Sequence, residues 1–188
     1  MGYETPYKWG YIHFVVTGAQ RVSMVGGGKT QHLELLKYLI TMGAPIDLRD
    51  IAGYTCLHHV SMRLSVPDIL RTLLEAGADP NWQDKYGGTP IAGACMTEQP
   101  ESIELLMEFG ADLDIKDADD FAIGYTKYPI YGPKVASAIH KWVLKRKGEE
   151  APLERKCDTC GKPAKGDLKL SFCSTCRMAS YCSRACQS

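Results

Sequence analysis

The chain has 188 residues, of which 45% are apolar and 23% charged, a composition that supports a packed core and excludes a disordered tail. Its 22 basic residues balance 22 acidic ones, so no overall field draws it to nucleic acid or an acidic membrane. It lacks both a run of roughly 18 apolar residues and a signal peptide. We therefore expect a cytoplasmic or nuclear protein, or both, in which eight cysteines indicate metal or isolated thiols rather than disulfides.

A segment recurs along the chain at a period of about 33 or 34 residues. Residues 39–47, 73–81 and 106–114 align, each with apolar residues that close a helix, followed by Gly-Ala and then by Pro in the first copy and Asp in the other two. The stretches 53–58 (GYTCLH) and 87–92 (GGTPIA) occupy equivalent places in the period. They resemble the Gly-x-Thr-Pro-Leu-His signature of the ankyrin repeat. This resemblance implies a mainly α fold, an ankyrin-repeat α-solenoid over residues 1–147 with about four repeats, the first and last degenerate.

The first repeat opens with residues 9–18, where His13 holds the family's histidine position although Gly10 and Tyr11 replace Thr-Pro. Residues 33–40 predict its second helix, with an apolar face that includes Tyr38 and a left-handed end at Gly43. The loop 24–30 between them ends in GGGKT, which resembles a phosphate-binding loop. A phosphate-binding loop needs a glycine five residues before its last glycine, here Gly28, but this chain has Ser23 at that place. We therefore expect a flexible insertion instead.

Repeats two and three follow the same plan. In repeat two Thr55 is expected to cap the first helix and His58 to bond neighbouring groups, while a metal site of Cys56 with His58 and His59 is the weaker alternative, because adjacent helical residues diverge by about 100°. The second helices begin at Pro67 and Pro100, which a first helical turn tolerates. Apolar residues of these helices are predicted to be buried, namely Ile69, Leu70, Leu73, Leu74, Ile103, Leu105, Leu106 and Met107. Cys56 and Cys95 are expected to be buried apolar groups rather than reactive thiols.

Repeat four decays after a turn at residues 117–122, since Tyr, Pro and Gly replace the expected helix pair. Helical spacing resumes at residues 134–144, which predicts a capping helix with a polar outer face. Its basic end, residues 145–147, suits the negative helix terminus, and nuclear import is a less favoured alternative. Residues 148–156 are interpreted as a linker.

The turns and first helices of such a stack form an elongated surface that binds proteins. The variable positions at the turn tips correspond to Arg49, Ile51, Tyr54, Trp82, Lys85, Tyr86, Lys116, Ala118 and Phe121. Trp82 and Tyr86 are candidate exposed anchors, or they pack against a neighbouring turn. Asn81 resembles the ankyrin asparagine that some hydroxylases modify, but we expect it to bond the turn backbone.

The C-terminal segment is rich in cysteine and locally basic. Two pairs have two residues between their cysteines and a third pair has three, spacings that let both thiolates of a pair reach one ion at about 2.3 Å. A segment this small cannot be stabilised by its own core, so Zn²⁺ would supply most of its folding free energy, roughly 10 to 16 kcal/mol. The predicted ligands are Cys157, Cys160, Cys173, Cys176, Cys182 and Cys186.

The detailed pattern of residues 157–188, with Arg177, Tyr181 before Cys182, and Gln187 after Cys186, looks like the MYND-type zinc finger. The resemblance implies a cross-brace in which the first and third cysteine pairs share one zinc ion. Cys173 and Cys176 would then serve a second ion whose remaining His and Cys would follow residue 188. Three interpretations remain: a finger cut inside the motif, which we favour, a natural one-ion finger, or a site that recruits an upstream residue such as His140.

These features predict a noncatalytic, zinc-binding adaptor for protein partners, which uses the ankyrin surface and a MYND finger. The resemblance implies proline-containing peptides as ligands of the finger and a possible role in transcriptional regulation. Specific nucleic acid, membrane and small-molecule substrates are not expected. The alternative is a component of a ubiquitin-ligase or methyltransferase system, although the chain has no recognisable catalytic domain.

Overall fold

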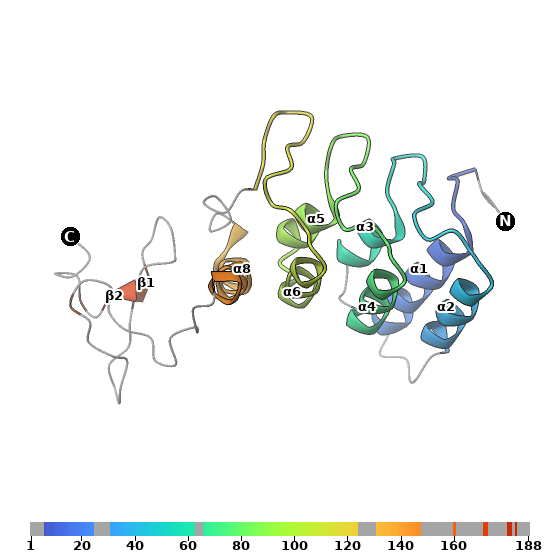
Figure 1. Ribbon diagram of the computed structural model, residues 1–188, viewed down its shortest axis with the longest axis horizontal. Coiled ribbons are helices and arrows are strands. Elements are labelled where there is room, and N and C mark those ends of the chain that lie inside the picture. The colour runs from blue at the N-terminus through green and yellow to red at the C-terminus, as the bar shows by residue number, and fades with distance from the viewer. Residues whose placement is uncertain are drawn as a thin grey trace.

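The computed structural model describes residues 6–24, 31–62, 66–123 and 131–147, together with Cys160, Ser183 and residues 171–172 and 180–181. In the first four ranges short antiparallel helices pair side by side and the pairs stack in a row, while the turns between pairs project from one side (Figure 1). This arrangement confirms the predicted α-solenoid. The helices are α1 (Tyr11–Met24), α2 (His32–Thr41), α3 (Cys56–Ser61), α4 (Pro67–Glu75), α5 (Pro90–Met96), α6 (Pro100–Glu108) and α8 (Pro133–Lys147).

The helix boundaries follow from local chemistry. Thr55 and Thr89 are the N-cap residues of α3 and α5, and prolines stand in the first turns of α4, α5 and α6, where a missing N–H costs no hydrogen bond. The α2 helix ends at Thr41 with Met42 as its C-cap, and the following Gly43 has a left-handed φ of 76°, as predicted. Short helices of six to ten residues are marginal alone, so packing between pairs has to stabilise them.

A continuous apolar layer runs between the helices of successive repeats. Every second-helix residue predicted to be buried in repeats two and three has an exposed fraction of 8% or less, which confirms that part of the prediction. The α3 and α5 helices approach closely because Gly93 has no side chain, and a Cβ there would lie 2.4 Å from the Met62 Cγ. The prediction for Tyr38 is wrong, since this residue on α2 is 59% exposed.

The fourth repeat forms the turn that the sequence predicts at residues 117–122. The Asp117 N–H donates to the Phe121 carbonyl at 2.9 Å, as the Asp50 and Asp84 N–H groups donate to Tyr54 and Gly88. The loss of pattern falls on residues 124–130, which lie outside the described residues. The α8 helix then packs on α6, with its Lys141 ammonium 3.2 Å from the Glu104 carboxylate.

Side-chain hydrogen bonds also join neighbouring repeats at the ends of the second helices. The Asn81 Nδ2 donates to the Gly110 carbonyl at 3.0 Å, and its Oδ1 accepts from the Asp112 N–H at 2.8 Å. This confirms the backbone-bonding role predicted for Asn81. Asp47 holds the equivalent position one repeat earlier, as both residues stand four positions after the terminal glycine, Gly43 or Gly77.

Asp47 fits this position less well than an asparagine. Its Oδ2 accepts from the Asp79 N–H at 3.4 Å, but its buried Oδ1 has no hydrogen-bond partner among the described residues. In the repeat alignment the Asp47 Oδ1 takes the place of the Asn81 Nδ2, which donates to the Gly110 carbonyl. The equivalent acceptor for Asp47 is the Gly77 carbonyl. Burial, with the nearby charge of Asp79, raises the pKa of the Asp47 carboxyl. The ionised carboxylate therefore destabilises this junction.

Among the described residues no helix is long and apolar enough to cross a membrane.

Asp47→Asn is expected to raise the free energy of unfolding at neutral pH by about 1 kcal/mol, because an amide nitrogen donates to the carbonyl that faces it. A group with a raised pKa in the folded state destabilises as pH rises, so the gain should shrink in acid, where Asp47 is protonated and donates itself. Urea unfolding at pH 7 and at a series of lower pH values measures both effects. Asn81→Asp is the matched control and should lower the free energy of unfolding by a similar amount at pH 7. A neutral or destabilising Asp47→Asn would show that the junction does not prefer an amide.

Candidate functional site

The projecting turns form one continuous row. Each turn is closed by an aspartate whose Oδ1 accepts two backbone N–H groups: Asp50 from residues 52 and 54, Asp84 from 86 and 88, and Asp117 from 119 and 121, at 2.6 to 3.0 Å. Adjacent turns are then joined by backbone bonds of 2.8 to 3.1 Å, from Ile51 N–H to the Tyr7 carbonyl, from Lys85 to Ala52 and from Ala118 to Tyr86. We call this set the turn row. Its backbone is a fixed platform for variable side chains.

The inner and outer turns differ at one backbone position. Gly53 and Gly87 adopt left-handed φ values of 86° and 78°, whereas Lys8 and Asp120 hold the equivalent places with φ of 60° and 59°. A side chain in this conformation costs roughly 1 kcal/mol or more. The two outer turns therefore differ from the inner ones at a position that the sequence analysis did not single out.

Most of the predicted tip residues are exposed along the turn row. Tyr86 is the most open aromatic residue there, at 69%, and Ile51 and Phe121 are 44% and 36% exposed. Arg49, Lys85, Lys116 and Ala118 are also exposed, so the row presents apolar groups beside cations.

Two predicted tip residues differ. The Tyr54 ring is half-buried and stacks on the His58 ring at 5.4 Å. Trp82, one of the two candidate exposed anchors, is half-buried, and the Arg49 guanidinium lies 5.0 Å from its ring centroid. Trp82 therefore packs against the neighbouring turn, where the exposed Arg49 guanidinium covers part of its ring and a cation over an indole face is favourable. Of the two anchors, only Tyr86 is fully exposed.

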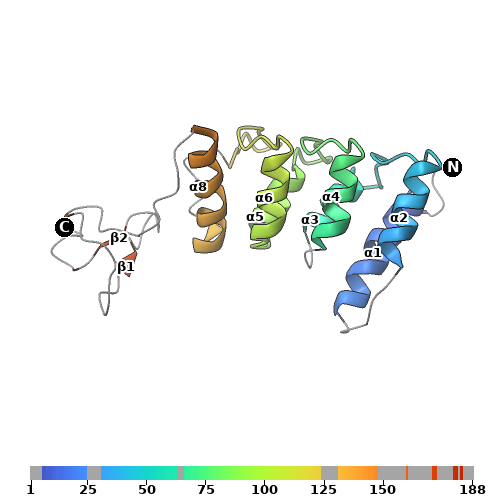
Figure 2. The same cartoon turned by 60° about the horizontal axis from the view of Figure 1, so that its bottom comes forward.

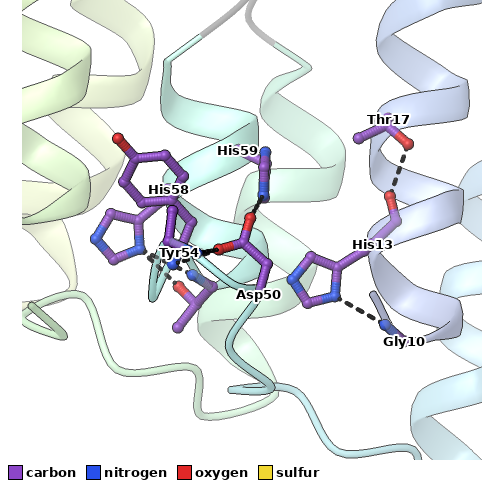
Figure 3. Close-up of polar contacts among 9 residues, drawn as sticks. Gly10, His13, Thr17, Asp50, Tyr54, His58 and His59 are labelled. Carbon is purple, nitrogen blue, oxygen red and sulfur yellow. Dashed lines mark hydrogen bonds and ion pairs between the residues drawn. The ribbon is translucent and has the colours of Figure 1, made fainter. Parts of the chain in front are cut away.

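Beneath the turn row, histidines connect the turns to the first helices (Figure 3). The His58 Nδ1 accepts from the Thr55 N–H at 3.1 Å, so its Nε2–H donates to the Gly88 carbonyl of the next turn at 3.0 Å. The Thr55 hydroxyl also reaches His58 Nδ1, at 3.0 Å. His58 thus has the bonding role that the sequence predicts, and it joins repeat two to repeat three.

His59 makes a contact that the sequence analysis missed. Its Nε2 lies 2.9 Å from the second oxygen of Asp50, and its backbone carbonyl accepts from Gln20 of α1 at 3.0 Å. The signal available was a histidine following the signature histidine, nine residues after the turn aspartate. Among the described residues no group of three His, Cys, Asp or Glu side chains is placed to hold a metal ion, and His58 and His59 point to different partners. The alternative of a metal site at Cys56, His58 and His59 is therefore wrong.

His13 repeats the His58 arrangement incompletely. Its Nδ1 accepts from the Gly10 N–H at 3.4 Å, but its buried Nε2 has no hydrogen-bond partner among the described residues. Its ring stacks on Trp9 and meets the edge of the His59 ring at 5.5 Å. Burial lowers the pKa of His13 to about 4, and the charge of His59 adds to this effect. His13 is therefore neutral in the folded protein near pH 7.

The cysteines outside the C-terminal segment are inert. Cys56 and Cys95 are 1% and 0% exposed. Burial raises the pKa of the Cys95 thiol to about 12 and that of Cys56 still further, aided by the charges of Asp47 and Asp50. A thiol with so high a pKa carries almost no reactive thiolate near neutral pH. This confirms the prediction that both are buried apolar groups.

In the C-terminal segment the structure describes a short antiparallel ladder of β1 (Ser171–Phe172) and β2 (Ser180–Tyr181), in which Ser171 pairs with Tyr181 and Phe172 with Ser180. Cys160 is exposed. The other five predicted zinc ligands, Cys157, Cys173, Cys176, Cys182 and Cys186, lie outside the described residues, so the ligand set stays a prediction. Six thiols are nevertheless the soft donor set that zinc prefers.

Comparisons with known proteins identify both kinds of module in the chain. A family model of ankyrin repeats, in three copies, matches residues 26–117, and a MYND finger model matches residues 157–188. The first match begins after α1, although α1 packs with α2 and α3 as other first helices do.

Similar proteins share the repeats. The chain is 42% identical over 67 residues to human BCL-6 corepressor-like protein 1, 38% over 86 residues to human SH3 and multiple ankyrin repeat domains protein 2, and 30% over 129 residues to mouse ankyrin repeat and SOCS box protein 5. These alignments cover 36%, 45% and 69% of this chain but only 4%, 5% and 37% of the three relatives.

The His13 environment predicts a loss of stability in acid. Because the pKa is about 4 folded and about 6.5 unfolded, the unfolded chain binds the proton first and stability falls as pH drops through this window, by about 3 kcal/mol at most. Urea unfolding of wild type and His13→Gln between pH 7.5 and 4.5 measures this loss. The variant should have the shallower pH dependence, and His140→Gln, at an exposed residue of α8, should match wild type. Equal slopes for all three would contradict this role of His13.

Proposed function

We propose that this chain, an ankyrin-repeat protein with a MYND-type zinc finger at residues 157–188, is a noncatalytic adaptor that holds one protein partner on its turn row and another on its finger. Ankyrin repeats and MYND fingers are both protein–protein interaction modules, and both are found here. The single observation that supports the first site is the turn row itself, a bonded platform with exposed apolar and cationic side chains.

The turn row has the composition of an interaction surface. Exposed aromatic residues contribute most of the binding free energy in protein interfaces, and charged residues at their edges steer association. Tyr86, together with Ile51 on the preceding turn, is the proposed centre of the binding site. Lys85 and Lys116 form its rim. Because these side chains stand on a fixed backbone, a partner loses little free energy to ordering the site.

The finger is proposed to bind Zn²⁺, since a MYND finger is a zinc-binding domain. Cys157, Cys160, Cys182 and Cys186 would hold one ion, and Cys173 and Cys176 would contribute to a second. Zinc held by four thiolates has no open position for water, so its proposed role is structural. Proline-containing peptides are the proposed ligands of the finger, and a role in transcriptional regulation in the nucleus or cytoplasm belongs to the same proposal.

Binding at the turn row is tested with one partner captured from cell extract by the intact, zinc-loaded chain and then purified. Tyr86→Ala should weaken the binding of that partner at least tenfold, about 1.4 kcal/mol, because truncation removes a central aromatic contact. Tyr86→Phe is the matched control and should retain binding. Titration calorimetry measures both variants. If neither Tyr86→Ala nor Cys157→Ser weakens the binding of any captured partner, the adaptor proposal fails.

Zinc content is tested by elemental analysis with thiol titration. One zinc per chain should leave two thiols reactive in the native protein, Cys173 and Cys176, because four are ligated and Cys56 and Cys95 are buried. Chelation should raise the number to six and unfolding to all eight, with the helical circular dichroism nearly unchanged on chelation. Two zinc ions per chain would mean that other residues complete the second site. No zinc, or a large loss of helicity on chelation, would contradict an independent zinc finger.

A further inference from the structure

The outer face of the first repeat, formed by α1 and α2, is apolar, and no other helix of the described residues packs on it. Of the ten exposed large hydrophobic residues among those the structure describes, four lie on these two helices and a fifth is the C-cap residue of α2. We call them the end face. They are Tyr11, Phe14, Leu35, Tyr38 and Met42, with exposed fractions of 43%, 43%, 46%, 59% and 58%. In both views the pair α1 and α2 stands at one end of the row, with α3 and α4 on one side only (Figures 1 and 2).

The repeat alignment shows what these positions do inside the stack. Counted from the terminal glycines Gly43, Gly77 and Gly110, Leu35 corresponds to Ile69 and Ser102, which are 2% and 0% exposed. Tyr38 corresponds on the same count to Thr72, which is half-buried, and to Leu105, which is 8% exposed.

The first helix gives the same result. Aligned on the histidines His13 and His58, Tyr11 corresponds to Cys56, which is 1% exposed. Phe14 corresponds to His59, whose ring meets the His13 ring of the preceding repeat at 5.5 Å, and in repeat three to Gly93, which faces Met62 of the preceding repeat. The end face therefore occupies the positions that interior repeats use to contact the repeat before them, and it continues the repeat–repeat interfaces of this chain.

The opposite end of the described stack is polar. On α8 the residues that pack inward are apolar, among them Val135 and Ile139 at 0% exposure. The exposed residues are Lys134, Ser137, His140, Lys141 and Lys145. A terminal repeat with a polar outer face is an ordinary cap, whereas an apolar end face is not. Head-to-tail stacking of two copies would set the apolar end against this polar one, which is unfavourable.

We propose that the end face binds the same face of a second copy of this chain, so that two stacks pair through α1 and α2 about a two-fold axis. Such pairing buries both apolar faces at once and closes on itself. Charge does not oppose it: the charged residues of α2 are Glu34 and Lys37, which form an ion pair with each other at 3.2 Å. The chain as a whole has a formal net charge of zero.

The size of the face sets the expected strength. Helices of 14 and 10 residues are about 21 and 15 Å long and pack about 10 Å apart, so the face measures roughly 20 by 20 Å. About 400 Å² per copy is half of a standard interface. We therefore expect a concentration-dependent dimer rather than an obligate one. It would bring two turn rows together and raise the avidity for a repeated partner.

Sedimentation velocity of the intact, zinc-loaded chain from about 2 to about 200 µM tests the pairing. Wild type should shift from monomer to dimer across this range, and Tyr38→Glu should raise the dimer dissociation constant at least tenfold, because it buries a charge in the interface. Tyr86→Glu is the matched control, since Tyr86 is similarly exposed but lies on the turn row. Circular dichroism checks that all three proteins retain the same helicity.

Three outcomes overturn the proposal. Wild type that stays monomeric at every concentration leaves the end face to another occupant, such as a repeat of a different chain. Equal weakening by Tyr38→Glu and Tyr86→Glu places the contact elsewhere. Species larger than a dimer that grow with concentration exclude a closed two-fold pair. Each result is independent of whether the turn row and finger bind other proteins.

Discussion

The described repeats depend on one interaction made three times: an aspartate oxygen that accepts two backbone N–H groups within its own turn. Because Asp50, Asp84 and Asp117 fix their turns identically, the turns bond to one another and the helices below them follow at a constant spacing. A helix of six residues such as α3 cannot be stable alone. The turns place it where its apolar side can pack against two neighbouring repeats.

In this regular stack, different groups are responsible for folding and for recognition. The groups that hold the stack together are backbone bonds, turn aspartates, His58 and a continuous apolar layer. The side chains that differ from turn to turn point outward and contribute little to the stability of the fold. Tyr86, Ile51 and Lys85 are among them. The two ends of the stack follow a different rule, because each has a neighbour on one side only, and there an apolar or polar residue decides whether the stack is capped or open.

Much of this could be predicted from sequence because the repeat period fixes which residues are equivalent. The buried leucines of α4 and α6, the inert Cys56 and Cys95 and the bonding roles of Asn81 and His58 all follow from local pattern. Tyr38, Tyr54 and Trp82 could not be placed in the same way. Their exposure depends on whether a neighbouring repeat or an Arg49 guanidinium covers them, and helical spacing is the same in either case. The Asp50–His59 contact was missed because residues nine apart meet only after the turn has formed.

By itself the sequence determined the class of fold and the chemistry available: a repeating helix pair, because apolar residues recur with the helical period, and six clustered cysteines whose spacing suits zinc. Only the tertiary structure decided which repeated positions are covered. Leu35 and Ile69 are both apolar residues at one position of the repeat, yet one is 46% exposed and the other 2%. The physical reason is that a repeat buries its apolar surface against its neighbours, so exposure belongs to the stack and not to the segment.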